Sequence, residues 1–260
     1  MKSRFMTLKP SGARIQVVEA GKGRDLLFLH GAGGHMANDP LIAALSTKYS
    51  VVAPLLPGYG QSTGEDGLRD MLDIALHALD VLEALKLRSP IVVGHSMGGM
   101  IAAEMAAIAH TEIAKLCLLA PAGLWLDDHP VVDIFSKLPF ELPGLLFHDA
   151  AAGQKLLASG GNMEDPEFLK QFLVMNARRM GMAGKILFPI PDRGLAQRLH
   201  RITARTLIVW GREDALIPAV YGDAFKKAIS KSRLIRIAKA GHALGQEKPA
   251  AVLKAIQDFF

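Results

Sequence analysis

The strongest constraint on the fold is a short apolar run that turns abruptly into a helix through glycine and serine. Residues 91–100 read IVVGHSMGGM, and the small residues of 101–107 favour a helix directly after them. An apolar run of this length is typical of a buried strand. Ser96 stands at the tip of the turn, between Gly94 and Gly98. We expect a strained, positive φ at Ser96, and glycine at the flanking positions because Cβ atoms there would collide with it.

The rest of the chain alternates between short apolar runs and helical stretches. The expected strands are residues 3–8, 14–19, 26–30, 50–54, 90–94, 115–120, 206–210 and 233–238, with a hairpin around 10–12. The clearest helix is 68–87, where apolar residues recur at three- and four-residue steps, and another closes the chain at 249–260. Strands joined by helices predict an α/β fold with a mostly parallel twisted sheet flanked by helices.

One stretch breaks this alternation. From 123 to about 201 the sequence has no convincing strand, only helical pieces punctuated by proline, such as 164–181. We therefore predict a core formed by residues 1–122 and 202–260, with residues 123–201 inserted as a helical cap.

Composition excludes several classes of function. Half of the 260 residues are hydrophobic, yet no apolar run approaches the length of a membrane span, and the N-terminus does not resemble a signal peptide. We expect a cytoplasmic protein with no membrane partner. The net charge of +5 comes from scattered lysines and arginines, which argues against nucleic acid as a partner. Cys117 is the single cysteine, so an internal disulfide and a cysteine metal cluster are excluded.

A second glycine-rich turn follows the strand expected at 26–30. Residues 26–34 read LLFLHGAGG, and such a turn leaves backbone N–H groups free to stabilise a developing oxyanion. Phosphate binding is the alternative, but neither G-x-x-x-x-G-K-[ST] nor G-x-G-x-x-G follows this strand. His30 ends the strand before a tight turn, so we expect it to have a structural, hydrogen-bonding role.

Four motifs resemble the α/β-hydrolase superfamily over nearly the whole chain. In order, they are the turn at 30–34, Gly-His-Ser-Met-Gly-Gly at 94–99, Gly-Arg-Glu-Asp at 211–214 and Gly-His at 241–242. The turn at 57–62 also resembles the family, although residues 53–56 lack the aspartate that many members have there. The first four motifs give the family's order of nucleophile, acid and histidine.

The resemblance implies a role for each motif. Ser96 would be the nucleophile, His242 the base and Asp214 the acid, while the N–H groups of Ala32 and Met97 would form the oxyanion hole. No metal or organic cofactor is implied. Glu213 is interpreted as a solvated charge, and Asp127 and Asp128 are the alternative positions for the acid.

The resemblance also limits the reactions that the protein is expected to catalyse. Serine at position 96 argues against epoxide hydrolases and haloalkane dehalogenases, which use aspartate there. We predict hydrolysis of a carboxylic ester. The enzyme alternatives are a carbon–carbon hydrolase of ring-fission diketone acids and a cofactor-free perhydrolase. The first would use Arg178 or Arg179 on a cap helix, but this chain has Ala243 where those enzymes commonly carry tryptophan. A ligand-binding shell is the non-enzyme alternative.

The substrate is expected to be a small or medium apolar acyl ester. Near the nucleophile, the predicted substrate contacts are Gly31, Gly33 and His95. On the cap, the predicted contacts are three apolar residues and one arginine: Phe168, Phe172, Met175 and Arg178. Further apolar candidates on the cap are Met163, Met180, Met182, Leu187 and Phe188. A homodimer is left open.

Overall fold

The computed structural model describes residues 1–260 with the exception of 10, 37, 88, 159–161 and 163. Pro10 of the expected hairpin and the cap candidate Met163 therefore lie outside the described residues.

The described residues form one sheet of eight strands. These are β1 (Lys2–Thr7), β2 (Arg14–Ala20), β3 (Arg24–Leu29), β4 (Tyr49–Pro54), β5 (Ile91–His95), β6 (Lys115–Leu119), β7 (Arg205–Gly211) and β8 (Ser232–Ile237). Their order is β1-β2-β4-β3-β5-β6-β7-β8. The β1–β2 and β2–β4 pairs are antiparallel, and every pair from β4 to β8 is parallel. The predicted mostly parallel α/β sheet is confirmed.

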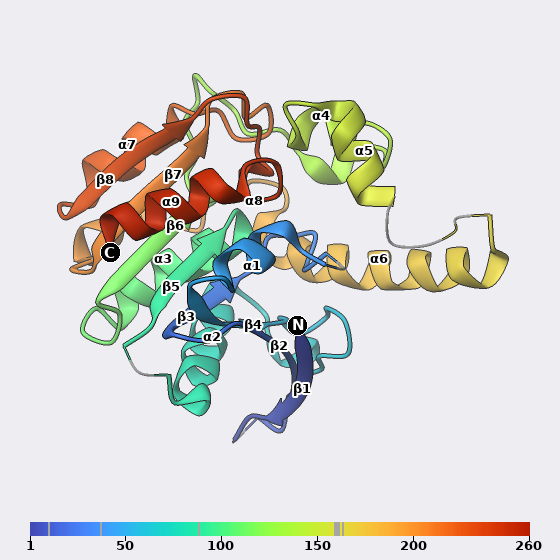
Figure 1. The fold of residues 1–260 in the computed structure, drawn as a ribbon, viewed down its shortest axis with the longest axis horizontal. Helices are drawn as coiled ribbons and strands as arrows, with labels where there is room; N and C mark the ends of the chain where they lie inside the picture. The colour runs from blue at the N-terminus through green and yellow to red at the C-terminus, as the bar shows by residue number, and fades with distance from the viewer. Residues whose placement is uncertain (10, 37, 88, 159–161, 163) are drawn as a thin grey trace.

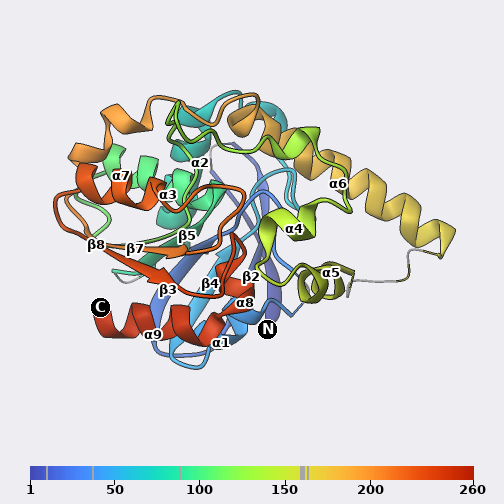
Figure 2. The ribbon, with the colours of Figure 1, turned by 90° about the horizontal axis from the view of Figure 1, so that it is seen from above.

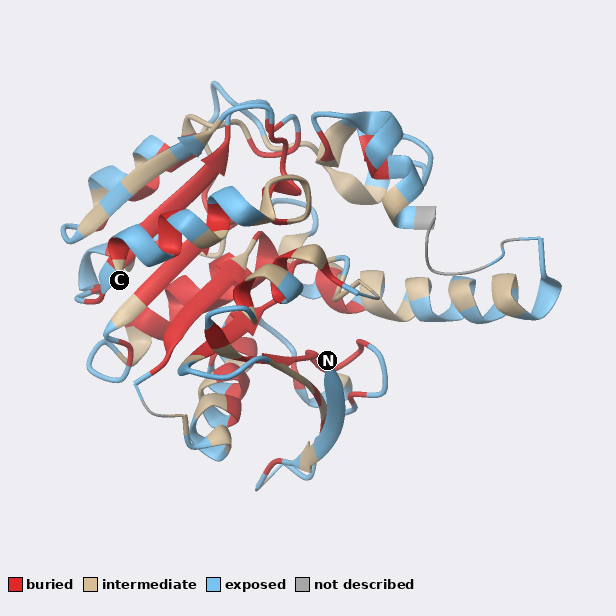
Figure 3. Cartoon of the chain, viewed as in Figure 1, coloured by how far each residue is buried: buried red, intermediate tan, exposed pale blue. Residues whose placement is uncertain are grey.

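Helices cover both faces of the sheet. In the view from above, α1 (Pro40–Leu45) and α9 (Pro249–Phe259) lie on one side, and α2 (Met71–Leu85), α3 (Met97–Ile108) and α7 (Tyr221–Ala228) lie on the other (Figure 2). The short helix α8 (Leu244–Glu247) precedes α9. Because both faces are covered, the central strands are buried along their length and read as continuous apolar runs (Figure 3).

Helix α2 is shorter at both ends than its apolar periodicity predicts. The Asp70 side chain accepts a hydrogen bond from the N–H of Asp73, so the helix begins at Met71 rather than at Leu68. At the other end Lys86 adopts a left-handed conformation with φ 51°, which stops the helix after Leu85.

Between β6 and β7 the described residues form helices and 3₁₀ turns without a strand. The elements are η2 (Ile134–Ser136), α4 (Leu142–Leu146), α5 (Ala150–Ala158), α6 (Pro166–Leu187), η3 (Leu195–Gln197) and η4 (Leu199–Arg201). Helix α6 projects away from the body of the molecule, and its buried residues, Met182, Ala183 and Ile186, lie near its C-terminal end (Figure 1). The described helices include none whose length and apolarity would suit a bilayer span.

Candidate active site

Ser96 lies in a sharp turn between β5 and α3. Its φ is 53° and its ψ is −118°, so the positive φ expected from the sequence is present. The Ser96 N–H donates to the carbonyl of Leu119, and the Ser96 carbonyl accepts from the N–H groups of Met100 and Ala122. Strand β6, the segment after it and the first turn of α3 therefore hold the strained residue in place.

The glycines beside Ser96 are required for a different reason from the one predicted. A Cβ atom at Gly94 would collide with the carbonyl group of Gly98. A Cβ atom at Gly98 would lie 2.5 Å from the carbonyl oxygen of His30 and still closer to that of Leu29. Both collisions are thus with backbone, that of Gly94 where α3 follows β5 and that of Gly98 where α3 packs against the end of β3, and not with the strained serine.

Three side chains predicted from distant motifs form one hydrogen-bonded chain. The Oγ atom of Ser96 lies 2.8 Å from Nε2 of His242, and Nδ1 of His242 lies 2.9 Å from Oδ2 of Asp214. Oδ1 of Asp214 accepts from the N–H groups of Leu216 and Ile217 at 3.0 and 2.8 Å. All three side chains are buried. The backbone thus fixes one carboxylate oxygen, and the other is directed at the imidazole.

The alternative acids are placed elsewhere. Asp127 accepts a hydrogen bond from the indole N–H of Trp125, and both Asp127 and Asp128 are exposed. The carboxylate bonded to His242 is that of Asp214.

Two glutamates hold the loop that carries His242. Glu213, expected from the sequence to be a solvated charge, accepts a hydrogen bond from the N–H of Ala240 at 3.1 Å. One carboxylate oxygen of Glu247 accepts from the N–H of Gly241 at 2.6 Å. Its other oxygen accepts from the N–H groups of His148 and Asp149 at 2.9 and 3.3 Å. Glu247 therefore joins the histidine loop to the junction between α4 and α5.

This bridge predicts a stability effect. Glutamine at position 247 is neutral and has a single acceptor oxygen, so in Glu247→Gln at least one of the three N–H groups loses its acceptor, at a cost of about 1–3 kcal/mol. Urea unfolding should show this loss, and the ester turnover expected from the sequence should fall with it, because the histidine loop is less well held. Glu83→Gln, the same change on the exposed face of α2, is the control and should alter neither. Equal stability of the two variants would contradict the bridging role.

The glycine-rich turn at 30–34 lies against the serine. A Cβ atom on Gly31 would lie 3.2 Å from Cβ of Ser96, whereas one on Gly33 would meet no atom within 4 Å. The hydroxyl of Tyr59 donates to the carbonyl of Ala32 at 3.1 Å and fixes the turn. Among the described residues, no hydrogen bond engages the N–H of Ala32 or of Met97. Both donors predicted for an oxyanion hole are therefore available.

Two histidines next to this turn, the buried His30 and the half-buried His95, have structural partners. Nδ1 of His30 donates to the carbonyl of Gly31 at 2.7 Å, and Nε2 accepts from the N–H of Leu56 at 3.1 Å. Burial, and secondarily the nearby His35, lowers the pKa of His30 to about 3. His95, predicted as a substrate contact, instead donates from Nε2 to the carbonyl of His242 at 2.9 Å. Burial lowers its pKa to about 4.

His30 and His77 give the free energy of unfolding a pH dependence. Burial lowers the pKa of His77 from 6.5 to about 4, as it lowers that of His30 to about 3. Below pH 6.5 the unfolded chain binds a proton at each site that the folded protein does not. Stability is therefore complete above this pH and falls as the pH drops toward 4, by about 1.4 kcal/mol per pH unit for each histidine.

His77→Leu measures one of these contributions. Nε2 of His77 has no hydrogen-bond partner among the described residues, so the substitution removes a proton site without breaking a bond at that atom. Urea unfolding between about pH 6 and about pH 5 should show a slope lower by about 1 kcal/mol per pH unit than in the wild type. An unchanged slope would show that His77 titrates normally.

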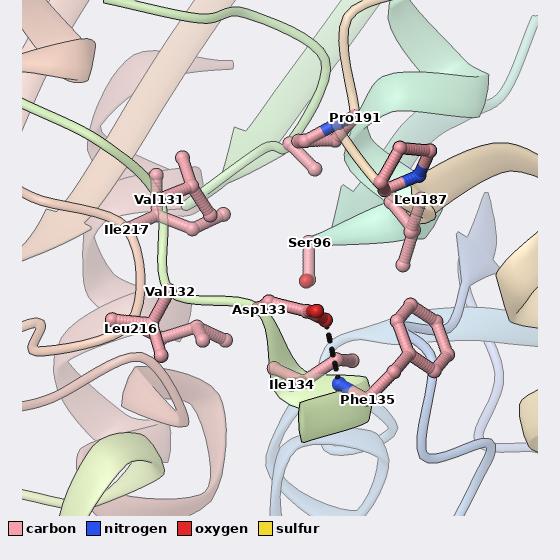
Figure 4. Close-up of a pocket in the computed structure, with 12 residues that line it drawn as sticks. Ser96, Val131, Val132, Asp133, Ile134, Phe135, Leu187, Pro191, Leu216 and Ile217 are labelled. Carbon is pink, nitrogen blue, oxygen red and sulfur yellow. Dashed lines mark hydrogen bonds between the residues drawn. The ribbon is translucent and has the colours of Figure 1, made fainter. Parts of the chain in front are cut away.

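A small pocket opens at the serine (Figure 4). Its volume is about 40 Å³, and the Ser96 hydroxyl points into it. Its walls come from residues 131–135, from the segment that follows α6 and from the loop that carries Asp214. Apart from Ser96 and Asp133, the lining residues are apolar.

Of the predicted cap residues, Leu187 lines this pocket, whereas Phe168, Phe172, Met175 and Arg178 do not. Phe168 and Phe172 stack on each other along α6, and Met175 is 55% exposed. Nε of Arg178 pairs with Glu65 at 2.6 Å, and its other nitrogens donate to backbone carbonyls. These side chains lie outside the pocket because α6 points away from the core, so that only its C-terminal end, at Leu187, reaches the pocket. The lining residues of 131–135, which lie in irregular chain and in the 3₁₀ turn η2, were not predicted from the sequence.

The sheet order, the strained serine and the triad geometry define a hydrolase of the α/β class. Residues 26–255 match the alpha/beta hydrolase family, so the chain belongs to it. The 2-hydroxy-6-oxo-6-phenylhexa-2,4-dienoate hydrolase of Burkholderia cepacia is 26% identical to this chain over an alignment of 292 positions. The alignment covers 99% of this chain and 96% of that protein.

Solved structures with the same fold carry different names. A bacterial membrane phospholipase A superposes with a TM-score of 0.77 at 22% identity, covering 99% of this chain and 85% of that one. The meta-cleavage product hydrolase of Pseudomonas fluorescens IP01 superposes with a TM-score of 0.74 at 18% identity, covering 99% and 98%. At these identities the likeness shows the fold alone.

Proposed function

We propose that the protein is a serine hydrolase that cleaves carboxylic esters through an acyl-enzyme on Ser96. The observation that carries the proposal is the buried Ser96–His242–Asp214 hydrogen-bonded chain, whose serine end opens on a largely apolar pocket. The 123–201 segment contributes residues 131–135 and Leu187 to the walls, which supports its role as a cap over the site.

The proposed reaction uses groups already in position. His242 takes the proton of Ser96 as Oγ attacks the ester carbonyl, and Asp214 holds the imidazole tautomer and stabilises its charged form. The N–H groups of Ala32 and Met97 stabilise the tetrahedral oxyanion. His242 then protonates the departing alcohol. A water molecule, deprotonated by His242, releases the acid and restores Ser96.

The charge of the pocket favours a neutral ester over a diketone acid. The dienoate named for the Burkholderia relative is a carboxylate, which calls for a cation in the site. Among the lining residues the charged one is Asp133, an acid, and like charges in a partly desolvated site repel. Arg178 is bonded to Glu65, and Arg179 is bonded to Asn176 and the Gly33 carbonyl. A carbon–carbon hydrolase is therefore the second candidate, supported by the relative's name.

The test is hydrolysis of p-nitrophenyl esters of increasing acyl length. Ser96→Ala should lower kcat by a factor of about ten thousand to a million, because it removes the nucleophile. Ser230→Ala, at an exposed serine after α7, is the matched control and should retain full activity. Wild-type protein that turns over a diketone acid but no ester would reverse the proposal in favour of the carbon–carbon hydrolase.

A further inference from the structure

Asp133 is a charged side chain in an otherwise apolar pocket. It lines the same pocket as Ser96 and points into it (Figure 4). Its neighbours in the wall include Val131, Val132 and Ile134. The residue is half-buried. No lysine, arginine or histidine is among the described residues that line the pocket with it.

One of its two carboxylate oxygens is engaged. Oδ1 accepts from the N–H of Phe135 at 2.8 Å and so caps the 3₁₀ turn η2. Among the described hydrogen bonds, none reaches Oδ2. A cap requires only one acceptor oxygen, which asparagine or serine supplies equally well. The turn therefore accounts for the side-chain oxygen of Asp133 but not for its negative charge.

A negative charge in this position has a marked effect on what binds. Apolar walls and partial exclusion of water strengthen charge interactions relative to bulk water. A carboxylate with a free oxygen then favours a ligand that brings a cationic N–H donor, because such hydrogen bonds are about twice as strong as neutral ones. The same charge disfavours an anionic substrate.

We propose that Asp133 is a specificity-determining residue that selects esters bearing a protonated amine close to the scissile bond. The inference rests on the proposed esterase function, and it adds the class of substrate. The ammonium group would donate to Oδ2 of Asp133 while the ester carbonyl lies at Ser96.

A pair of thioesters that differ in one charge tests this proposal. Dimethylaminoethyl thiobutyrate carries a protonated tertiary amine at neutral pH, and isopentyl thiobutyrate has a C–H group in its place with nearly the same shape. Thiol release gives kcat/KM for each. A second pair, the p-nitrophenyl esters of dimethylaminobutanoic acid and of its isopropyl analogue, places the charge on the acyl side instead. The pair in which the enzyme discriminates more strongly for the charged member identifies which side of the ester, alcohol or acyl, faces Asp133.

The measured quantity is the ratio of kcat/KM for the cationic ester to that for its neutral partner. In at least one pair this ratio should fall by about tenfold or more in Asp133→Asn, which keeps the cap oxygen and loses the charge. The chemical reactivity of the two esters is the same in both enzymes, and a general loss of activity cancels in the ratio. Asp128→Asn, which removes an exposed charge from the same segment, should leave the ratio unchanged.

The outcomes separate this inference from the function on which it rests. Turnover of both members of each pair, with the same ratio in wild type and Asp133→Asn, overturns the role of Asp133 and leaves the esterase intact. An equal fall in the ratio in Asp128→Asn also overturns it, because the effect would then be one of net charge. No turnover of any ester, or turnover that persists in Ser96→Ala, overturns the esterase and the inference together.

Discussion

Asp214→Asn is expected to lower kcat for ester hydrolysis by about ten-thousandfold without unfolding the protein. The carboxylate now accepts from Nδ1 of His242, which leaves Nε2 free to take the proton of Ser96. An asparagine amide donates to Nδ1 instead and places the ring proton on Nε2, where it faces the serine. The base is then in the wrong tautomer. The fold should survive because the asparagine oxygen still accepts from the N–H groups of Leu216 and Ile217.

The measurement is kcat on a p-nitrophenyl ester together with thermal unfolding of each variant. Asp127→Asn is the matched control, since Asp127 is the alternative acid of the sequence analysis and lies exposed beside Trp125. It should retain wild-type kcat. A loss below about tenfold in Asp214→Asn would contradict the triad, and a large loss in Asp127→Asn would assign the acid to that residue.

Gly98→Ala is expected to have the largest effect on folding, with a loss of about 3 kcal/mol or more. The new Cβ atom would overlap the carbonyl oxygens of Leu29 and His30, which are backbone atoms at the end of β3. Relief requires α3 to move away from β3. That movement displaces Ser96 and the oxyanion turn at 30–34 relative to each other, so the fraction that folds should have little activity.

Gly181→Ala provides the comparison within the same chain. Gly181 lies inside α6, and a Cβ atom there would meet nothing within 4 Å. Alanine at this position should stabilise by up to about 1 kcal/mol, because it favours the helix. Urea midpoints of the two variants should therefore move in opposite directions. Wild-type stability in Gly98→Ala would mean that the elbow does not pack as described.

The central strands of the sheet were predictable because they are buried on both faces. Their apolar runs, such as 206–210 within β7, are bounded by polar or turn residues, and this pattern places these strands to within two residues. Helix boundaries were less predictable. The apolar periodicity of α2 continues through Leu68, and only the side-chain cap at Asp70 decides where the helix begins.

The triad was predictable because each member follows a strand in a recognisable motif. The supporting and lining residues were not. Glu247 acts through backbone N–H groups near position 148, about a hundred residues away in the chain. Asp133 lies in an irregular stretch with no periodicity, so no pattern in the sequence places it beside Ser96. On α6, periodicity identified apolar residues but not the direction of the helix.

The proposed esterase reaction requires an acyl-enzyme on Ser96. Acid quenching during turnover of p-nitrophenyl butyrate, followed by peptide mass spectrometry, tests it most directly. One butyryl group is expected on the peptide that contains Ser96, and none in Ser96→Ala. Rapid p-nitrophenol release with no acyl group on that peptide, or with the acyl group on another residue, would contradict it.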